Sequence, residues 1–177
     1  SLSFKQPVET IESIVIGNLN LLEAIRLSNY PIKFYNAGSS EMFGDTINPA
    51  NEKNALNPKS PYGVAKSAAY YQVANYREAY NLFCCSGILF NHESPRRGFE
   101  FVTRKITHAV ARIKFGLQKD LKLGNMDAKR DWGHAEDYVK AMWMMLNKKK
   151  PEDFVISTGR QYSVRDFAKL AFKAVNL

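Results

Sequence analysis

The hydrophobic positions of the chain repeat with two different periods, which predicts that helices and strands alternate. In residues 7–29, apolar side chains recur at intervals of three and four, and Pro7 suits a first helical turn. Residues 62–80 contain no proline and predict another helix. The same helical pattern returns in residues 101–115, 135–146 and 164–175, with Ser163 placed to cap the last of these helices.

Short apolar runs separate these helices and predict strands. The runs occupy residues 32–37, 84–90, 121–123 and 154–157, and Gly38 is expected to end the first. Strands that alternate with helices indicate βαβ units and a mainly parallel sheet, that is, a protein of the α/β class. Ligands of such sheets bind outside the carboxyl ends of the strands.

Two polar loops follow predicted strands. Residues 38–61 are rich in Gly, Asn, Pro and Ser, and residues 91–98 carry amide, imidazole, carboxylate and guanidinium groups. A long loop inside a compact domain is usually either functional or a wrongly assigned element. Because both loops follow strand ends, we expect them to flank one site.

Composition and charge narrow the possible partners. The chain has 177 residues, of which 45% are hydrophobic, and a net charge of +8, typical of a folded globular domain. Residues 101–150 carry most of the positive excess. That excess admits nucleic acid, an anionic membrane or phosphorylated small molecules as partners.

Cysteine usage and hydropathy indicate a cytoplasmic location. Cys84 and Cys85 are adjacent in an apolar run, where a mutual disulfide would be strained, so we expect a reducing compartment. Apolar runs stay shorter than the roughly 20 residues that cross a bilayer. The first ten residues also lack the layout of a signal peptide. We therefore expect no membrane partner.

A phenol and an ammonium lie four residues apart at Tyr62 and Lys66, on one face of the predicted helix. A nearby lysine favours the phenolate form, which suits a general base. A chain with this many tyrosines and lysines also contains such a pair by chance, on a solvated helix surface. Ser39 and Glu41, which follow the preceding strand, strengthen the catalytic interpretation, although turn formation by the serine and solvation of the carboxylate are alternatives.

Basic side chains in the later loops suit phosphate groups. Arg96 and Arg97 are adjacent in the 91–98 loop, and Arg130 lies beside Trp132 in a turn-rich segment. Guanidinium groups bind phosphate oxygens bidentately. Solvated basic turns remain the alternative interpretation.

Other chemistries find little support in the motifs. The three histidines are widely spaced and no Cys-x-x-Cys pair occurs, so we expect no metal site. The chain also lacks the Gly-x-Ser-x-Gly pattern of a hydrolase and the glycine-rich turns that hold dinucleotides or triphosphates.

Taken together, these motifs resemble the extended short-chain dehydrogenases/reductases, and more narrowly the GDP-mannose 4,6-dehydratase family. The resemblance rests on residues 37–44, 60–66, 75–82, 87–98, 101–106, 130–134 and 151–156, in the order of the family. Tyr-x-x-x-Lys is shared by the whole superfamily, whereas residues 91–98 and 130–134 are specific to the dehydratases. The resemblance implies a Rossmann-type, doubly wound sheet.

The resemblance also implies roles for individual residues. The catalytic residues would be Ser39, Glu41, Tyr62 and Lys66; the NADP-binding residues Lys66, His92 and Arg97; and the GDP-sugar-binding residues Asn91, Lys105 and Arg130. In the implied reaction Tyr62 deprotonates the mannose C4 hydroxyl as NADP takes the C4 hydride, and Glu41 then removes the C5 proton. Water leaves from C6, the hydride returns there, and GDP-mannose becomes GDP-4-keto-6-deoxymannose.

Family members begin with a strand, a glycine-rich turn and a helix, and these 177 residues enter after those elements. We therefore expect a fragment of a longer enzyme that forms dimers or tetramers. Residues 1–99 would belong to the NADP-binding domain and residues 100–177 mainly to a substrate-binding region, with the strand near 154–157 returning to the sheet. Another nucleotide-sugar dehydratase or epimerase, or a non-catalytic basic module that binds nucleic acid, remains an alternative.

Overall fold

The structure, a computed structural model, describes residues 2–177, and these form two compact units. The first, which we call the sheet unit, runs through Phe90 and includes Glu136–Ile156. The second, which we call the basic unit, comprises Asn91–Ala135 and Ser157–Leu177. This division differs from a boundary at residue 99, because the 91–98 loop belongs to the basic unit while the helix after residue 135 belongs with the sheet.

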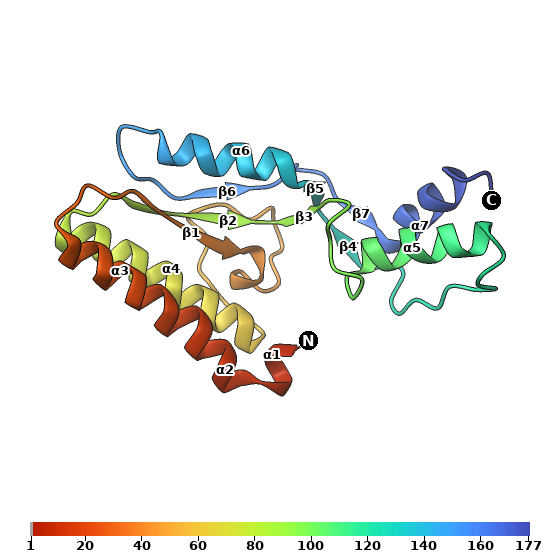
Figure 1. Cartoon of the computed structure of the whole chain (residues 1–177), viewed down its shortest axis with the longest axis horizontal. Helices are drawn as coiled ribbons and strands as arrows, with labels where there is room; N and C mark the ends of the chain where they lie inside the picture. Colours follow the sequence, from red (N-terminus) through yellow and green to blue (C-terminus); the bar gives the residue numbers. More distant parts are fainter. Residues whose placement is uncertain (1) are drawn as a thin grey trace. The chain divides into compact units, whose positions relative to one another are not determined.

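Three parallel strands form the centre of the sheet unit: β1 (Phe34–Ser39), β2 (Cys84–Leu89) and β6 (Phe154–Ile156), in the order β1-β2-β6. Helices α3 (Gly17–Ser28) and α4 (Pro61–Tyr80) cover one face of this sheet, and α6 (Ala135–Leu146) lies on the other (Figure 1). The predicted α/β class with a parallel sheet is confirmed. The strand predicted near 154–157 does return to the sheet.

The amino-terminal helical segment is longer and less regular than its sequence predicts. It comprises α1 (Leu2–Lys5), α2 (Pro7–Ile11), a π-helical turn (Glu12–Ile16) and α3. Pro7 occupies the first turn of α2, as expected, and Asn29 ends α3 in the left-handed conformation, with φ 57°. A polar residue with a short side chain tolerates that conformation better than most.

The interface between α3, α4 and the sheet forms a core of the sheet unit. Leu22, Val73 and Cys84 are fully buried there, and Tyr76 is nearly so. Burying side chains of this size stabilises the fold by roughly 1.5–3 kcal/mol each. This packing therefore fixes α4, which carries the Tyr-x-x-x-Lys motif, against strands β1 and β2.

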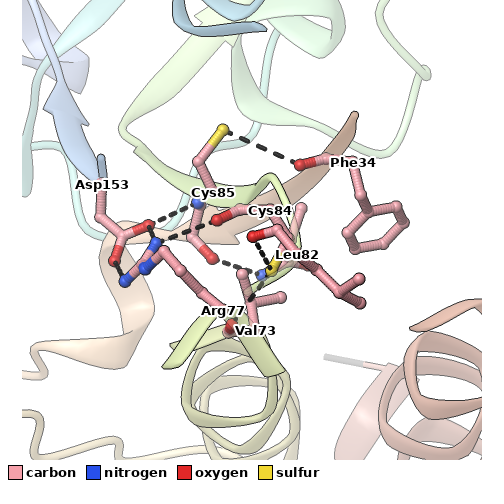
Figure 2. A network of polar contacts seen from close by, with 9 residues as sticks. Phe34, Val73, Arg77, Leu82, Cys84, Cys85 and Asp153 are labelled. Carbon is pink, nitrogen blue, oxygen red and sulfur yellow. Dashed lines mark hydrogen bonds and ion pairs between the residues drawn. The ribbon is translucent and has the colours of Figure 1, made fainter. Parts of the chain in front are cut away.

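A polar network locks β6 to α4 and β2 (Figure 2). The two carboxylate oxygens of Asp153 accept hydrogen bonds from the guanidinium of Arg77 at 2.9 and 2.7 Å, and one also accepts from the backbone N–H of Ser86 at 2.6 Å. Arg77 donates a further bond to the carbonyl of Cys84. Because the Asp153 side chain is only 9% exposed, these hydrogen bonds take the place of water in stabilising its carboxylate.

The basic unit is built from two helices and two small sheets. Helices α5 (Val102–Lys114) and α7 (Val164–Lys173) pack through a buried cluster that includes Ile106, Val110 and Val164. Strands β3 (Asn91–Glu93) and β5 (Trp132–His134) pair in parallel, while β4 (Lys129–Arg130) and β7 (Tyr162–Ser163) pair antiparallel. Ser163 caps α7 by accepting a hydrogen bond from the backbone of Asp166, as its position predicts.

Three local expectations from the sequence are wrong. Gly38 does not end β1 but lies within it, where a Cβ atom would come within 3.0 Å of the Gly87 carbonyl oxygen, so close strand packing explains the glycine. Residues 121–123 form no strand: Leu121 and Leu123 are apolar because they pack on the α5–α7 cluster. The 91–98 segment, expected to be a loop, begins with β3.

Both cysteines are free thiols in β2, buried from solvent. Burial raises the pKa of each thiol to about 11, so neither is a nucleophile near neutral pH. Their sulfur atoms lie near the carbonyl oxygens of Val73 and Phe34 (Figure 2). In the described part of the chain, no helix combines the length and the apolar character needed to cross a membrane.

Candidate active site

The first catalytic candidates lie on a tight turn at the carboxyl end of β1. Ser39 is the last residue of the strand and caps a 3-10 turn (Ser40–Met42), with its hydroxyl oxygen accepting from the backbone N–H of Glu41 at 3.3 Å. The capping bond uses a lone pair of the hydroxyl oxygen and leaves the hydroxyl proton able to donate. Glu41 lies in this turn with an exposed side chain. The turn therefore places a hydroxyl and a carboxylate at the strand end, where parallel sheets bind their ligands.

Ser60 connects this turn to the start of α4. Its hydroxyl donates to the Glu41 carboxylate at 2.9 Å and accepts from the backbone N–H of Gly63 at 3.0 Å, so one side chain caps the helix and orients the carboxylate. Gly63 is needed here because a Cβ atom would come within 2.8 Å of the Glu41 carbonyl oxygen. Sequence reasoning gave Ser60 no such role, although Ser-Pro before a helical pattern is an N-terminal capping signal.

Tyr62 and Lys66 lie one turn apart on α4, as their spacing predicts. The Nζ atom of Lys66 is 5.6 Å from the centroid of the Tyr62 ring and donates to the carbonyl oxygen of Ala37, within β1, at 2.9 Å. Burial lowers the pKa of the Lys66 ammonium. The hydrogen bond to the strand thus fixes the ammonium on the side of α4 that carries the Tyr62 ring.

The four residues therefore belong to one strand, turn and helix. Lys66 is bonded to the strand that ends at Ser39, and Glu41 is bonded to the cap of the helix that carries Tyr62. The structure places the four catalytic candidates on β1, on the turn that follows it and on α4. Chemically, the arrangement holds a carboxylate and a phenol that can act as two separate proton acceptors.

The remaining candidates lie in the basic unit. Asn91 and His92 are in β3, opposite Trp132 and Gly133 of β5. Lys105 is an exposed residue on α5, and Arg130 is an exposed residue on β4. The described contacts join neither Lys105 nor Arg130 to the other candidates of this unit.

Buried Asp131 holds the segment next to Arg130 in place. Its carboxylate, in a residue only 5% exposed, accepts hydrogen bonds from the backbone and hydroxyl of Thr158 and from the backbone of Gly159, at 2.8 to 3.1 Å. These bonds hold the residue between β4 and β5 against the backbone of Thr158 and Gly159. No local sequence pattern signals this anchoring role, because the partners lie 27 and 28 residues apart.

Arg97 is held by a carboxylate and an aromatic ring. Its Nε atom lies 3.2 Å from Oε2 of Glu93, and its Cζ atom is 3.6 Å from the centroid of the Phe101 ring. The same Glu93 oxygen accepts a 2.5 Å hydrogen bond from the hydroxyl of Thr103 on α5. The sequence singled out Arg97 but not the residues that support it.

A pocket of about 430 Å³ opens beside this cluster, within the basic unit. Trp132 and Phe167 supply aromatic walls, with ring centroids 5.4 Å apart, while Glu93, Thr103 and Arg104 add polar groups. The Nε atom of Arg104 is buried without a hydrogen-bond acceptor. Such a mixture of aromatic walls and a few polar groups is typical of small-molecule sites.

The two units differ sharply in charge. The basic unit contains 14 Lys and Arg against six Asp and Glu, which is the whole net charge of +8, whereas the sheet unit contains 11 of each kind. A local positive field attracts phosphate groups. Residues 2–177 hold no group of three or more side chains arranged for a metal ion.

A parallel sheet with a hydroxyl and a carboxylate at one strand end, and Tyr-x-x-x-Lys on the following helix, defines an extended short-chain dehydrogenase/reductase fold. Solved structures agree. The chain matches the RMD structure from Pseudomonas aeruginosa complexed with NADPH with a TM-score of 0.94, at 24% identity, over 99% of this chain and 62% of that one. A dTDP-glucose 4,6-dehydratase from Bacillus anthracis in complex with NAD matches with a TM-score of 0.82, at 24% identity, over 94% and 53%.

Sequence comparison narrows the class further. The model of the GDP-mannose 4,6 dehydratase family matches residues 1–177, and the chain belongs to this family. It is 52% identical over 181 residues to GDP-mannose 4,6 dehydratase 1 of Arabidopsis thaliana, and 53% identical over 180 residues to GDP-mannose 4,6-dehydratase of Vibrio cholerae. Both alignments cover 100% of this chain, but 50% and 48% of those relatives. The chain thus spans about half the length of the curated relatives it matches.

Proposed function

We propose that the protein carrying this chain converts GDP-mannose to GDP-4-keto-6-deoxymannose with the help of NADP. The observation that supports this best is the link between Glu41 and the cap of the helix that carries Tyr62. A dehydratase of this kind needs two proton acceptors, one for a hydroxyl and one for a carbon acid. The sheet unit supplies both from one strand, turn and helix.

The chemistry of each side chain suits the proposed step. Tyr62, with the Lys66 ammonium near its ring, accepts the proton of the C4 hydroxyl as that carbon is oxidised. The resulting ketone acidifies the C5 hydrogen, and Glu41 removes it as a proton while the C6 hydroxyl takes up a proton and leaves as water. Return of the hydride to C6 and of a proton to C5 then completes the 4-keto-6-deoxy product. Ser39 donates a hydrogen bond to a sugar oxygen, since its own oxygen is already held by the Glu41 backbone.

The described residues fit a dinucleotide phosphate cofactor in two respects. Lys66 donates a hydrogen bond to Ala37 within β1, and the guanidinium of Arg97 forms an ion pair with Glu93 and lies over the Phe101 ring. We propose that Lys66, His92 and Arg97 hold NADP and that Asn91, Lys105 and Arg130 hold the GDP-sugar. When bound, NADP supplies reversible hydride transfer, so that the overall reaction needs no external oxidant. The RMD structure is a complex with NADPH and the Bacillus anthracis dehydratase structure is a complex with NAD, which supports a nicotinamide cofactor.

Glu41→Gln tests this proposal. The full-length variant is expected to bind GDP-mannose but to form no 4-keto product, because the amide cannot accept the C5 proton. Asp45→Asn is the matched control, since Asp45 is an exposed acid on the same loop. Undiminished product formation by Glu41→Gln, followed by the absorbance of the 4-keto sugar, contradicts the proposed role.

A nucleotide-sugar 4-epimerase is the second candidate, because UDP-glucose 4-epimerase from Thermotoga maritima shares the fold with a TM-score of 0.87. An epimerase inverts C4 and removes no C5 proton, so Glu41 would be dispensable for it. Incubation with GDP-mannose and with UDP-glucose separates the two candidates. A 4-keto product from GDP-mannose supports the dehydratase, whereas interconversion of 4-epimers supports the alternative.

The sequence also supports proposals on the location, the oligomeric state and the partners of the protein. We propose a cytoplasmic enzyme that forms a homodimer or homotetramer and binds neither nucleic acid nor membrane. The positive charge of the basic unit would then serve nucleotide phosphates. Retention of the protein on nucleic acid at physiological salt, with a steep dependence on salt, would instead favour a nucleic-acid-binding module.

A further inference from the structure

Glu93 occupies a fixed position at the end of β3. Its backbone pairs with His134 of β5, and its side chain is 17% exposed. Oxygen Oε2 accepts the hydroxyl of Thr103 and lies 3.2 Å from Nε of Arg97. The carboxylate therefore joins the strand, α5 and the 94–98 loop at one point.

The guanidinium of Arg97 is restrained on two sides. Its Nε atom forms an ion pair with Glu93 at 3.2 Å without a hydrogen bond, one of its faces lies over the Phe101 ring, and its side chain remains 26% exposed. The backbone of the loop is tightened by a hydrogen bond from the Arg97 N–H to the Ser94 carbonyl, at 3.0 Å. A long side chain restrained in this way loses less conformational freedom when it binds a ligand.

We infer that Glu93 is a positioning residue that presents the terminal nitrogens of Arg97 to a phosphate group of the dinucleotide cofactor. This inference rests on the proposed function, in which Arg97 binds NADP. Two effects of Glu93 oppose each other. Its negative charge weakens the attraction of this loop for an anion, whereas its contact with Arg97 organises the cation that binds the anion. The inference is that positioning outweighs the charge.

Glu93→Gln distinguishes the two effects because they predict opposite signs. Positioning predicts that NADPH binds more weakly, with a dissociation constant raised about five- to tenfold, whereas charge alone predicts tighter binding. The constant is measured by titrating the full-length protein with NADPH and following nucleotide fluorescence, which requires no turnover. Glu100→Gln, an equal charge change at an exposed residue close by, is expected to shift the constant less than about twofold.

A double-mutant cycle shows whether Glu93 acts through Arg97. In an Arg97→Ala background, Glu93→Gln is expected to have almost no further effect on NADPH binding. An equal loss in both backgrounds overturns the inference, as does an unchanged or tighter dissociation constant for Glu93→Gln alone.

Thr103 provides a second route if Glu93→Gln does not fold. Thr103→Val removes the hydroxyl that holds the Glu93 carboxylate, and it is expected to raise the dissociation constant, whereas Thr103→Ser keeps the hydroxyl and the wild-type value. Equal affinities for the two variants overturn the inference. Failure of the wild-type protein to bind NADPH at all would instead overturn the proposed function. Normal wild-type binding with an unaffected Glu93→Gln variant refutes only the positioning role.

Discussion

The sheet unit and the basic unit differ in net charge. The sheet unit has equal numbers of acidic and basic side chains, and Lys66 and Asp153 are bonded there to a strand carbonyl and a strand N–H. The basic unit carries the entire excess of eight positive charges, and Lys105 and Arg130 are exposed. The difference fits the proposed function, in which the sheet unit supplies the proton-transfer groups and the basic unit binds anions.

This division predicts that substitutions in the two units affect different measured quantities. Substitutions in the sheet unit are expected to affect chemical steps or folding, and to act alike at low and high salt. Substitutions or salt that act on the basic unit are expected to affect binding.

Tyr62→Phe is expected to lower kcat by about 10²- to 10⁴-fold, the range for removal of a general base, with little change in NADPH affinity. Tyr71→Phe is the matched control, because Tyr71 lies on the same helix with 59% of its surface exposed. Steady-state rates with GDP-mannose and NADPH titrations provide the two measurements. A fall in NADPH affinity with unchanged kcat would assign Tyr62 to cofactor binding and contradict the proposed difference between the two units.

Asp153→Ala is expected to lower the free energy of unfolding by about 3 kcal/mol, because it leaves the Arg77 guanidinium buried without its carboxylate. The neighbouring substitution Glu152→Ala removes an exposed pair with Lys148 and is expected to cost less than about 1 kcal/mol. Chemical denaturation of both variants measures the difference. Equal losses would show that the network in Figure 2 contributes no more than a surface ion pair.

Salt is expected to act on binding. Raising the ionic strength from about 0.05 to about 0.5 M shortens the screening length severalfold, so KM for GDP-mannose should rise severalfold while kcat changes little. Initial rates over this range of salt, with the ionic strength set by a single salt, test the prediction. A fall in kcat at constant KM would place the salt-sensitive groups at the chemical step.

The smallest expected effect concerns acid stability in the sheet unit. Hydrogen bonds from Arg26, and then from Tyr76, lower the pKa of Glu23 to about 2. Because the folded state holds this carboxylate ionised, its contribution is present above the unfolded pKa, near 4.5, and is lost as the pH falls toward 2. The stability difference between wild type and Glu23→Gln should therefore shrink over that interval. A difference independent of pH contradicts the assignment.

The sequence predicts the sheet unit better than the basic unit, and the reason is physical. The helices of both units are predicted because each extends over several turns, and strands β2 and β6 of the sheet unit are predicted because they are runs rich in apolar residues. Strands β3 and β5 contain three residues each and are defined by pairing across about 40 residues of chain, which leaves no local pattern. The apolar residues Leu121 and Leu123 mislead for the same reason, because they serve a distant helix cluster.

The contacts within the candidate site are also only partly predictable from the sequence. Tyr62 and Lys66 share a helix, so their geometry follows from spacing alone, whereas the Ser60–Glu41 bond spans 19 residues. The support of Arg97 by Glu93 and Phe101 depends on how a loop folds back on α5. Residue types can therefore identify the reactive groups, but their positioning partners emerge only from the fold.

The most direct test of the proposed elimination is turnover of GDP-mannose in D₂O by the full-length protein. If Glu41 removes the C5 proton, the wild-type 4-keto product gains deuterium at C5, and Glu41→Gln forms no such product. The same protein incubated with preformed product provides the correction for later exchange. A 4-keto product that retains its C5 hydrogen, or equal deuterated product from Glu41→Gln, contradicts the account.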